Sequence, residues 1–205
     1  MATIALIGIG YLPPIVLRNS VVSRTATVAD NYFFALTLPS RTTEQLLHWR
    51  ATALPADTGI PVAREQLYMV LAWMNAPTAS QLTQLQPIIS GLRSPSFTFT
   101  LNDAGYWPRS GQLWVGCRPA PRELLQLADL LRSRVARIGC PQPAFPFHPH
   151  VTLLRQAPTS IRLPKRDFSW PVTCQHFSLI SSRYQRGRVI LNTEQHYPLF
   201  DREQD

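Results

Sequence analysis

The stretch FPFHPHVTLLR, Phe145–Arg155, carries the pattern from which the fold and the chemistry of this chain can be predicted. Its second half reads as a β-strand, in which alternate side chains share a face. His148, His150 and Thr152 then lie on one face, and the apolar residues between them point into the core. An imidazole can move a proton, and a neighbouring hydroxyl can donate to an anionic oxygen. Arg155, at the end of the strand, can clamp the same anion.

Apolar runs of strand length and helical periodicities alternate on both sides of this stretch. Strands are predicted at residues 32–38, 66–74, 97–101, 113–116, 148–154, 177–182 and 188–192, and helices at 42–54, 77–94 and 121–138. The strand at 97–101 is expected to form a hairpin with the strand at 113–116, and Thr42 with Gln45 forms a capping-box pattern. This order predicts an α+β protein with mixed or antiparallel sheets. The glycine-rich motifs of Rossmann and P-loop nucleotide binding do not occur in the sequence.

The composition indicates a folded, basic protein. The chain has 205 residues, of which 45% are apolar, so there is enough material for a core. Twenty basic against twelve acidic residues give a net charge of +8, which favours a polyanionic partner such as nucleic acid. Nineteen of the twenty are arginine, which suits phosphate recognition, although codon usage in a GC-rich genome explains the excess equally well.

The basic residues are concentrated in one part of the sequence. No acidic residue lies between Asp129 and Asp167, so we expect one region of the surface to carry most of the positive potential. The basic residues of this interval are Arg132, Arg134, Arg137, Arg155, Arg162, Lys165 and Arg166.

The cysteines and the first thirty residues bear on where the protein acts. Three cysteines without a C-x-x-C pair disfavour a disulfide framework or a zinc site and predict buried thiols in a reducing cytoplasm.

Residues 1–17 carry no charged side chain, but Pro13 and Pro14 interrupt this apolar run, and no basic residue precedes it. Both features disfavour a secretion signal or a membrane anchor. We expect residues 1–30 to be an extension outside the fold, residues 31–205 to form one domain, and no membrane association.

Several stretches of the sequence, taken in order, indicate a function for the strand at 148–154. The opening YFFALTLP, the following TTEQLLHWRA and the FHPHVTLLR stretch, in this order, resemble the 2H phosphoesterase superfamily. More specifically, residues 32–195 are similar to the bacterial RNA 2',3'-cyclic phosphodiesterase family, also called 2'-5' RNA ligase. The resemblance implies a bilobal, pseudo-twofold α+β fold in which antiparallel or mixed sheets line a central cleft and helices lie outside. Two H-x-T-x motifs are then expected to face each other across the cleft.

This resemblance assigns roles to both motifs, and the first of them is changed. His150 and Thr152 correspond to the second motif and are the expected catalytic residues. For the first motif the family reads L-H-L-T-L-A-F, whereas this chain reads LYMVLAW over residues 67–73. Tyr68 therefore stands in place of the first histidine, and Val70 in place of the first threonine.

The family reaction is expected to need neither metal nor other cofactor. By resemblance, water attacks the cyclic phosphorus and opens the ring to a 2'-phosphomonoester. The second-motif histidine accepts the proton from water, the first-motif histidine protonates the leaving oxygen, and the threonines hold the other phosphoryl oxygens. The expected partner is RNA, or an oligonucleotide, that carries a 2',3'-cyclic phosphate or a 2'-5' linkage, and the protein is expected to be a monomer.

Three functional hypotheses remain open at this point. The first is an enzyme of the family's class that retains activity through Tyr68 or a neighbouring group. The second is a catalytically weakened member that still binds RNA ends through Thr152, Arg155 and the basic surface. The third, a metal site on His148 and His150, is disfavoured because no carboxylate lies nearby in the sequence.

Aromatic residues outside the motif have two possible roles. Trp107, Arg109 and Trp114 could stack on a base or simply pack between the lobes. Phe147 should face away from the catalytic side and belong to the core.

Overall fold

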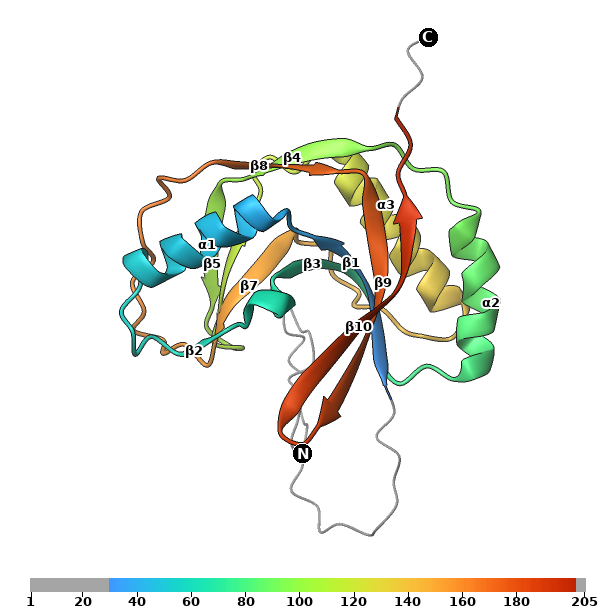
Figure 1. Cartoon of the computed structure of the whole chain (residues 1–205), viewed down its shortest axis with the longest axis horizontal. Coiled ribbons are helices and arrows are strands. Elements are labelled where there is room, and N and C mark those ends of the chain that lie inside the picture. Colours follow the sequence, from blue (N-terminus) through green and yellow to red (C-terminus); the bar gives the residue numbers. More distant parts are fainter. Residues whose placement is uncertain (1–29, 202–205) are drawn as a thin grey trace, which may run out of the picture.

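Two four-stranded antiparallel sheets and a two-stranded sheet make up the β-structure of this computed structural model, which describes residues 30–201 (Figure 1). The first sheet has the order β10 (Arg188–Pro198), β9 (His176–Gln185), β1 (Asn31–Thr37) and β3 (Tyr68–Met74). The second has the order β2 (Ile60–Pro61), β7 (His150–Arg155), β6 (Gln112–Gly116) and β5 (Asp103–Trp107). The third consists of β4 (Phe97–Leu101) and β8 (Trp170–Cys174).

Three α-helices lie at the outside of the molecule (Figure 1). They are α1 (Ser40–Ala53), α2 (Ala79–Ser90) and α3 (Arg122–Arg137), and a short 3-10 helix, η1 (Arg64–Gln66), precedes β3. Helix α3 packs on β3, and α2 packs on α3. This arrangement confirms the predicted α+β fold. The predicted extension, residues 1–30, lies outside the described residues except for Asp30.

The predicted hairpin between residues 97–101 and 113–116 is wrong. β4 pairs with β8, and β6 pairs instead with β5 and β7. The sequence of β5, DAGYW, has a weak strand signal because of its aspartate and glycine. Gly105 is nevertheless required there, since a Cβ atom at this position would lie 2.2 Å from the Trp114 indole.

The predicted capping box of the first helix is also wrong. Helix α1 has Pro39 at its N-cap and no side-chain cap, and Thr42 and Thr43 are buried. A reciprocal capping box occurs at α2, where Thr78 accepts from the Gln81 amide and the Gln81 side chain accepts from the Thr78 amide.

The register between β1 and β3 contains a β-bulge that determines which side chains face the second sheet. Ala35 lies opposite Val70 and Phe34 lies opposite Ala72, so Leu71 is an extra residue. Beyond the bulge, the alternation of side chains is shifted by one position. Trp73 consequently joins Tyr68 and Val70 on one face, packed against Phe33.

A second bulge between β6 and β7 has the same effect on the other lobe. Leu113 lies opposite Leu154 and Trp114 opposite Thr152, so Leu153 is the extra residue. Both Leu153 and Leu154 are buried as a result. Arg155 thereby comes to the face that carries His150 and Thr152.

Candidate active site

A pocket of about 340 Å³ lies where β3 and β7 face each other; we call it the cleft pocket. It is lined by Ile60, Gln66, Tyr68, Val70, Trp73, Ser110, Gln112, His150, Thr152, Arg155, Gln156, Ser182 and Val189. The two residue pairs of the motif positions therefore line one hollow, as predicted from the sequence. Side chains from β9 and β10 complete its rim on the side of the first sheet.

The two bulged strands present their pocket residues with the same spacing. On β7 these are residues 150, 152 and 155, and on β3 they are residues 68, 70 and 73. The β7 set is polar, with an imidazole, a hydroxyl and a guanidinium group. The β3 set consists of Tyr68, Val70 and Trp73 and is largely apolar. The cleft pocket is thus chemically asymmetric although its two walls are built alike.

The surroundings of His150 favour a neutral imidazole that can act as a base. Its Nδ1 lies 2.8 Å from the backbone carbonyl oxygen of His148, which can only accept, so Nδ1 carries the proton and Nε2 keeps a free lone pair. The Trp107 ring covers the imidazole edge-on, with ring centroids 4.6 Å apart. Burial lowers the pKa of His150 to about 4, partly opposed by the bond to the His148 carbonyl. At neutral pH the imidazole is therefore uncharged and able to accept a proton.

Thr152 and Arg155 can receive an anion next to this base. Thr152 is half-buried on the strand, and Arg155 is exposed at its end. The positive charge of Arg155 also reaches across the pocket, because it acts on the ionisation of Tyr68. A hydroxyl donor and a guanidinium group beside a neutral imidazole form a site that suits a phosphoryl group.

The opposite wall is poorly equipped to donate a proton. The Tyr68 ring packs on Phe33 with centroids 4.8 Å apart, and Phe33 in turn stacks on Trp73 at 5.2 Å. Burial raises the pKa of Tyr68 to about 12. The phenol is therefore a far weaker acid than an imidazolium, and the isopropyl side chain of Val70 donates no hydrogen bond.

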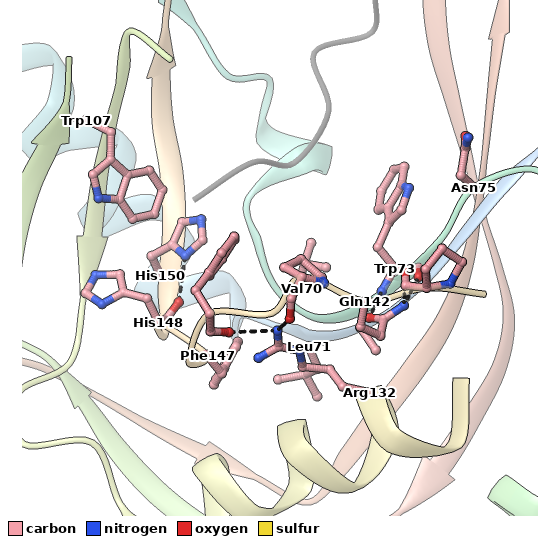
Figure 2. A pocket seen from close by; sticks show the side chains of 14 residues that line it. Val70, Leu71, Trp73, Asn75, Trp107, Arg132, Gln142, Phe147, His148 and His150 are labelled. Atoms are coloured by element: carbon pink, nitrogen blue, oxygen red, sulfur yellow. Dashed lines mark hydrogen bonds between the residues drawn. The ribbon is translucent and has the colours of Figure 1, made fainter. Parts of the chain in front are cut away.

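A second hollow of about 300 Å³ adjoins the cleft pocket and shares Val70, Trp73 and His150 with it; we call it the apolar pocket (Figure 2). Its lining is Val70, Leu71, Ala72, Trp73, Asn75, Trp107, Arg132, Pro141, Gln142, Pro143, Phe145, Phe147, His148 and His150. Flat apolar side chains surround it, so it can accept a flat ring.

The loop that closes the apolar pocket is held by two polar side chains. Gln142 accepts from the Trp73 amide at 3.3 Å and donates to the Trp73 carbonyl at 2.6 Å, which ties the loop to β3. Arg132 of α3 donates to the carbonyl oxygens of Pro143 and Phe145. Figure 2 shows Gln142, Trp73 and Arg132 beside the pocket.

Several residues lie where the sequence pattern did not place them. Phe147 packs against the core but is only half-buried and also lines the apolar pocket. His148 precedes β7 and lines the apolar pocket, while Trp114 is buried against its ring at 4.5 Å. Trp73 and its place on the cleft wall were missed, because the bulge that turns it there depends on cross-strand register.

The basic residues of the interval between Asp129 and Asp167 have separate roles. Arg155 lines the cleft pocket, Arg132 holds the loop, and Arg166 pairs with buried Asp103 at 2.8 Å. Across residues 30–201, no group of three or more His, Cys, Asp or Glu side chains is placed to hold a metal ion. The metal alternative on His148 and His150 thus gains no third protein ligand from the described part of the chain.

Sequence comparison matches residues 49–185 to the 2'-5' RNA ligase superfamily. The chain belongs to this superfamily. It is 45% identical over 157 residues to the RNA 2',3'-cyclic phosphodiesterase of Escherichia coli, a match that covers 77% of this chain and 89% of that protein. It is 28% identical over 162 residues to the protein of the same name from Thermus thermophilus, covering 73% of this chain and 80% of the relative.

Solved structures of superfamily members support the same fold. A crystal structure of Escherichia coli LigT in complex with 3'-AMP superposes with a TM-score of 0.79 at 41% identity and covers 83% of this chain and 98% of that chain. This match supports the α+β fold that the sequence predicted. The helices described for residues 30–201 are all too short or too polar to cross a membrane.

Proposed function

We propose that this chain binds RNA ends that carry a 2',3'-cyclic phosphate and hydrolyses them slowly to 2'-phosphomonoesters. The observation that carries the proposal is the state of His150, whose Nε2 is free and uncharged on the wall that also presents Thr152 and Arg155. Curated relatives with the name RNA 2',3'-cyclic phosphodiesterase at up to 45% identity support the choice of substrate.

In the proposed reaction, the oxygen of a water molecule attacks phosphorus while His150 Nε2 accepts the proton of that water. The bond between phosphorus and the 3'-oxygen breaks, and the phosphate remains on the 2'-oxygen. Thr152 and Arg155 hold the non-bridging oxygens as negative charge develops on them. The neighbouring apolar pocket accepts the base of the terminal nucleotide.

The β3 wall makes this reaction slow. The departing 3'-oxygen needs a proton, and the pKa of about 12 makes Tyr68 a poor donor. Loss of a matched acid costs ~10²- to 10⁴-fold in rate, and loss of one anion-stabilising donor ~10²- to 10³-fold, although the two effects need not multiply. Turnover is therefore expected to lie at least ~10²-fold below that of an enzyme with both motifs.

The proposal is tested by incubating the protein with adenosine 2',3'-cyclic phosphate, without added metal, and separating adenosine 2'-phosphate from adenosine 3'-phosphate. Slow formation of the 2'-phosphate alone is expected. It should be abolished by His150→Ala, reduced by Thr152→Ala, and unaffected by His48→Ala, which changes an exposed histidine of α1. Equal product from His150→Ala and the unmodified protein would refute the assignment of the base.

A binding module is the second candidate, and the apolar β3 wall is the observation that favours it. In that case the protein forms no product but still binds adenosine 2'-phosphate. The affinity should fall with rising salt and with Arg155→Ala, because binding needs charge and shape but no proton transfer.

The proposal extends to the cellular compartment and the oligomeric state of the protein. We propose that the protein works as a monomer in the cytoplasm, where RNA cleavage generates cyclic ends. The three cysteines, Cys117, Cys140 and Cys174, are free and buried, in keeping with a reducing compartment.

A further inference from the structure

The hairpin formed by β9 and β10 extends beyond the body of the first sheet and ends in a tight two-residue turn (Figure 1). Arg186 and Gly187 occupy the turn with φ of 49° and 79°, as a type I' turn requires. Such a turn matches the twist of its strands, so the tip is a defined structural element.

One face of this hairpin is continuous with the cleft pocket. Ser182 and Val189 both line that pocket. Tyr184 lies opposite Val189 in the register, so its ring is on the same face of the hairpin. It lies two residues closer to the tip than Ser182. Tyr184 is 36% exposed although it is a large aromatic residue.

The tip is positively charged and has no acidic residue of its own. Residues 183–193 contain three arginines and neither aspartate nor glutamate. Arg183 is neutralised by Asp30, with two hydrogen bonds of 2.6 Å. Arg186 and Arg188 are exposed and form no ion pair with any residue of the described range 30–201.

We propose that the tip of this hairpin binds the single-stranded RNA that precedes the terminal nucleotide, with Tyr184 stacking on a base and Arg186 contacting a phosphate. An exposed aromatic ring next to an unpaired guanidinium group is the combination that recognises single strands without sequence preference. The inference rests on the proposed function, because it places the RNA end in the cleft pocket. It adds that oligonucleotides bind more tightly than mononucleotides.

Arg188 provides a matched control. It lies opposite Gln185 in the register and so belongs to the other face of the hairpin. The variant Arg188→Ala removes the same charge from the same tip without altering the face that continues into the cleft pocket. Tyr184→Phe is the second control, since it keeps the ring and loses only the hydroxyl.

The test compares the binding of adenosine 2'-phosphate with that of a tetranucleotide that has a 2'-phosphate end. Calorimetry and fluorescence anisotropy at several salt concentrations measure both affinities. Tyr184→Ala should weaken tetranucleotide binding about tenfold, and Tyr184→Phe and Arg188→Ala by less than about twofold. Arg186→Ala should reduce the slope of log affinity against log salt by about 0.7, as expected for one single-strand phosphate contact. Affinity for the mononucleotide should stay unchanged in all four variants.

Two results would overturn the inference. One is equal loss of affinity for mononucleotide and tetranucleotide, which would place Tyr184 in the terminal site. The other is unchanged tetranucleotide affinity in Tyr184→Ala and Arg186→Ala. A tetranucleotide with a plain 3'-hydroxyl end distinguishes failure of the hairpin contact from failure of the proposed function. If Tyr184→Ala still weakens binding of this tetranucleotide while the protein hydrolyses no cyclic phosphate, the hairpin contact is supported and only the proposed reaction is refuted.

Discussion

The Trp107 indole meets the His150 imidazole edge-on, with the ring centroids 4.6 Å apart and the planes at 78°. This contact helps to remove water from an imidazole whose pKa is lowered from 6.5 to about 4 by burial. Trp107 lies on β5, so the strand that lacked a clear sequence signal supplies part of the environment of the proposed base.

The pH dependence of turnover follows from this pKa. Because protonated imidazole cannot accept a proton, activity should persist as the pH falls through 6.5 and disappear near 4. Trp107→Ala should expose the ring and move this acidic limb upward, toward 6.5. The pH profile of kcat/KM and an NMR titration of the His150 ring measure the shift. An acidic limb at the same pH in both proteins would contradict the role of Trp107.

Stability should depend on pH through the same group. Between about 4 and 6.5 the unfolded chain binds a proton at residue 150 and the folded protein does not. The free energy of unfolding is therefore expected to fall as the pH decreases through this window. Urea unfolding of the unmodified protein and of His150→Gln at several pH values checks the sign, since the variant should lose this part of the dependence.

Restoring the first motif should restore catalysis. The double change Tyr68→His with Val70→Thr supplies an imidazolium as acid and a hydroxyl as anion donor, and should raise turnover of the cyclic substrate by at least ~10²-fold. Tyr68→Phe should leave turnover nearly unchanged, because a phenol with a pKa of about 12 contributes little as an acid. A large loss in Tyr68→Phe would instead identify Tyr68 as the acid that is used.

The weakness of the acid should matter less when the leaving group needs no proton. A nucleoside 2'-(4-nitrophenyl phosphate) releases 4-nitrophenolate, which departs as an anion. The unmodified protein should therefore hydrolyse this ester much faster than the cyclic phosphate, and the restored double variant should gain little on it. Loss of both activities in His150→Ala is expected. Equal gains of the double variant on the two substrates would argue against a missing acid.

Gly105 should be essential for the packing of β5. A Cβ atom there would lie 2.2 Å from the Trp114 ring, so Gly105→Ala should cost about 1–3 kcal/mol in the free energy of unfolding. Gly91→Ala is the control, because its Cβ would meet no atom closer than 3.4 Å. Chemical denaturation of the two variants gives the comparison, and equal stabilities would contradict the steric argument.

The sequence predicted most of the helices and strands and the polar face of β7, because these follow from local periodicity. It did not predict the two bulges, because a bulge depends on the register between two paired strands and not on local sequence periodicity. For that reason Trp73 was not expected on the wall of the cleft pocket. The pairing of β4 with β8 was missed in the same way, since it joins segments that lie 69 residues apart at Leu101 and Trp170.

Val70, Trp73 and His150 belong to both hollows of the cleft, so the two cavities adjoin at these shared side chains. One compact molecule with a planar hydrocarbon ring at one end and a phosphonate at the other would occupy both at the same time. Such a compound would compete with the nucleotide at two points, and its tether would run past the three shared side chains. The cleft therefore offers a starting point for inhibitor design by joining two small fragments.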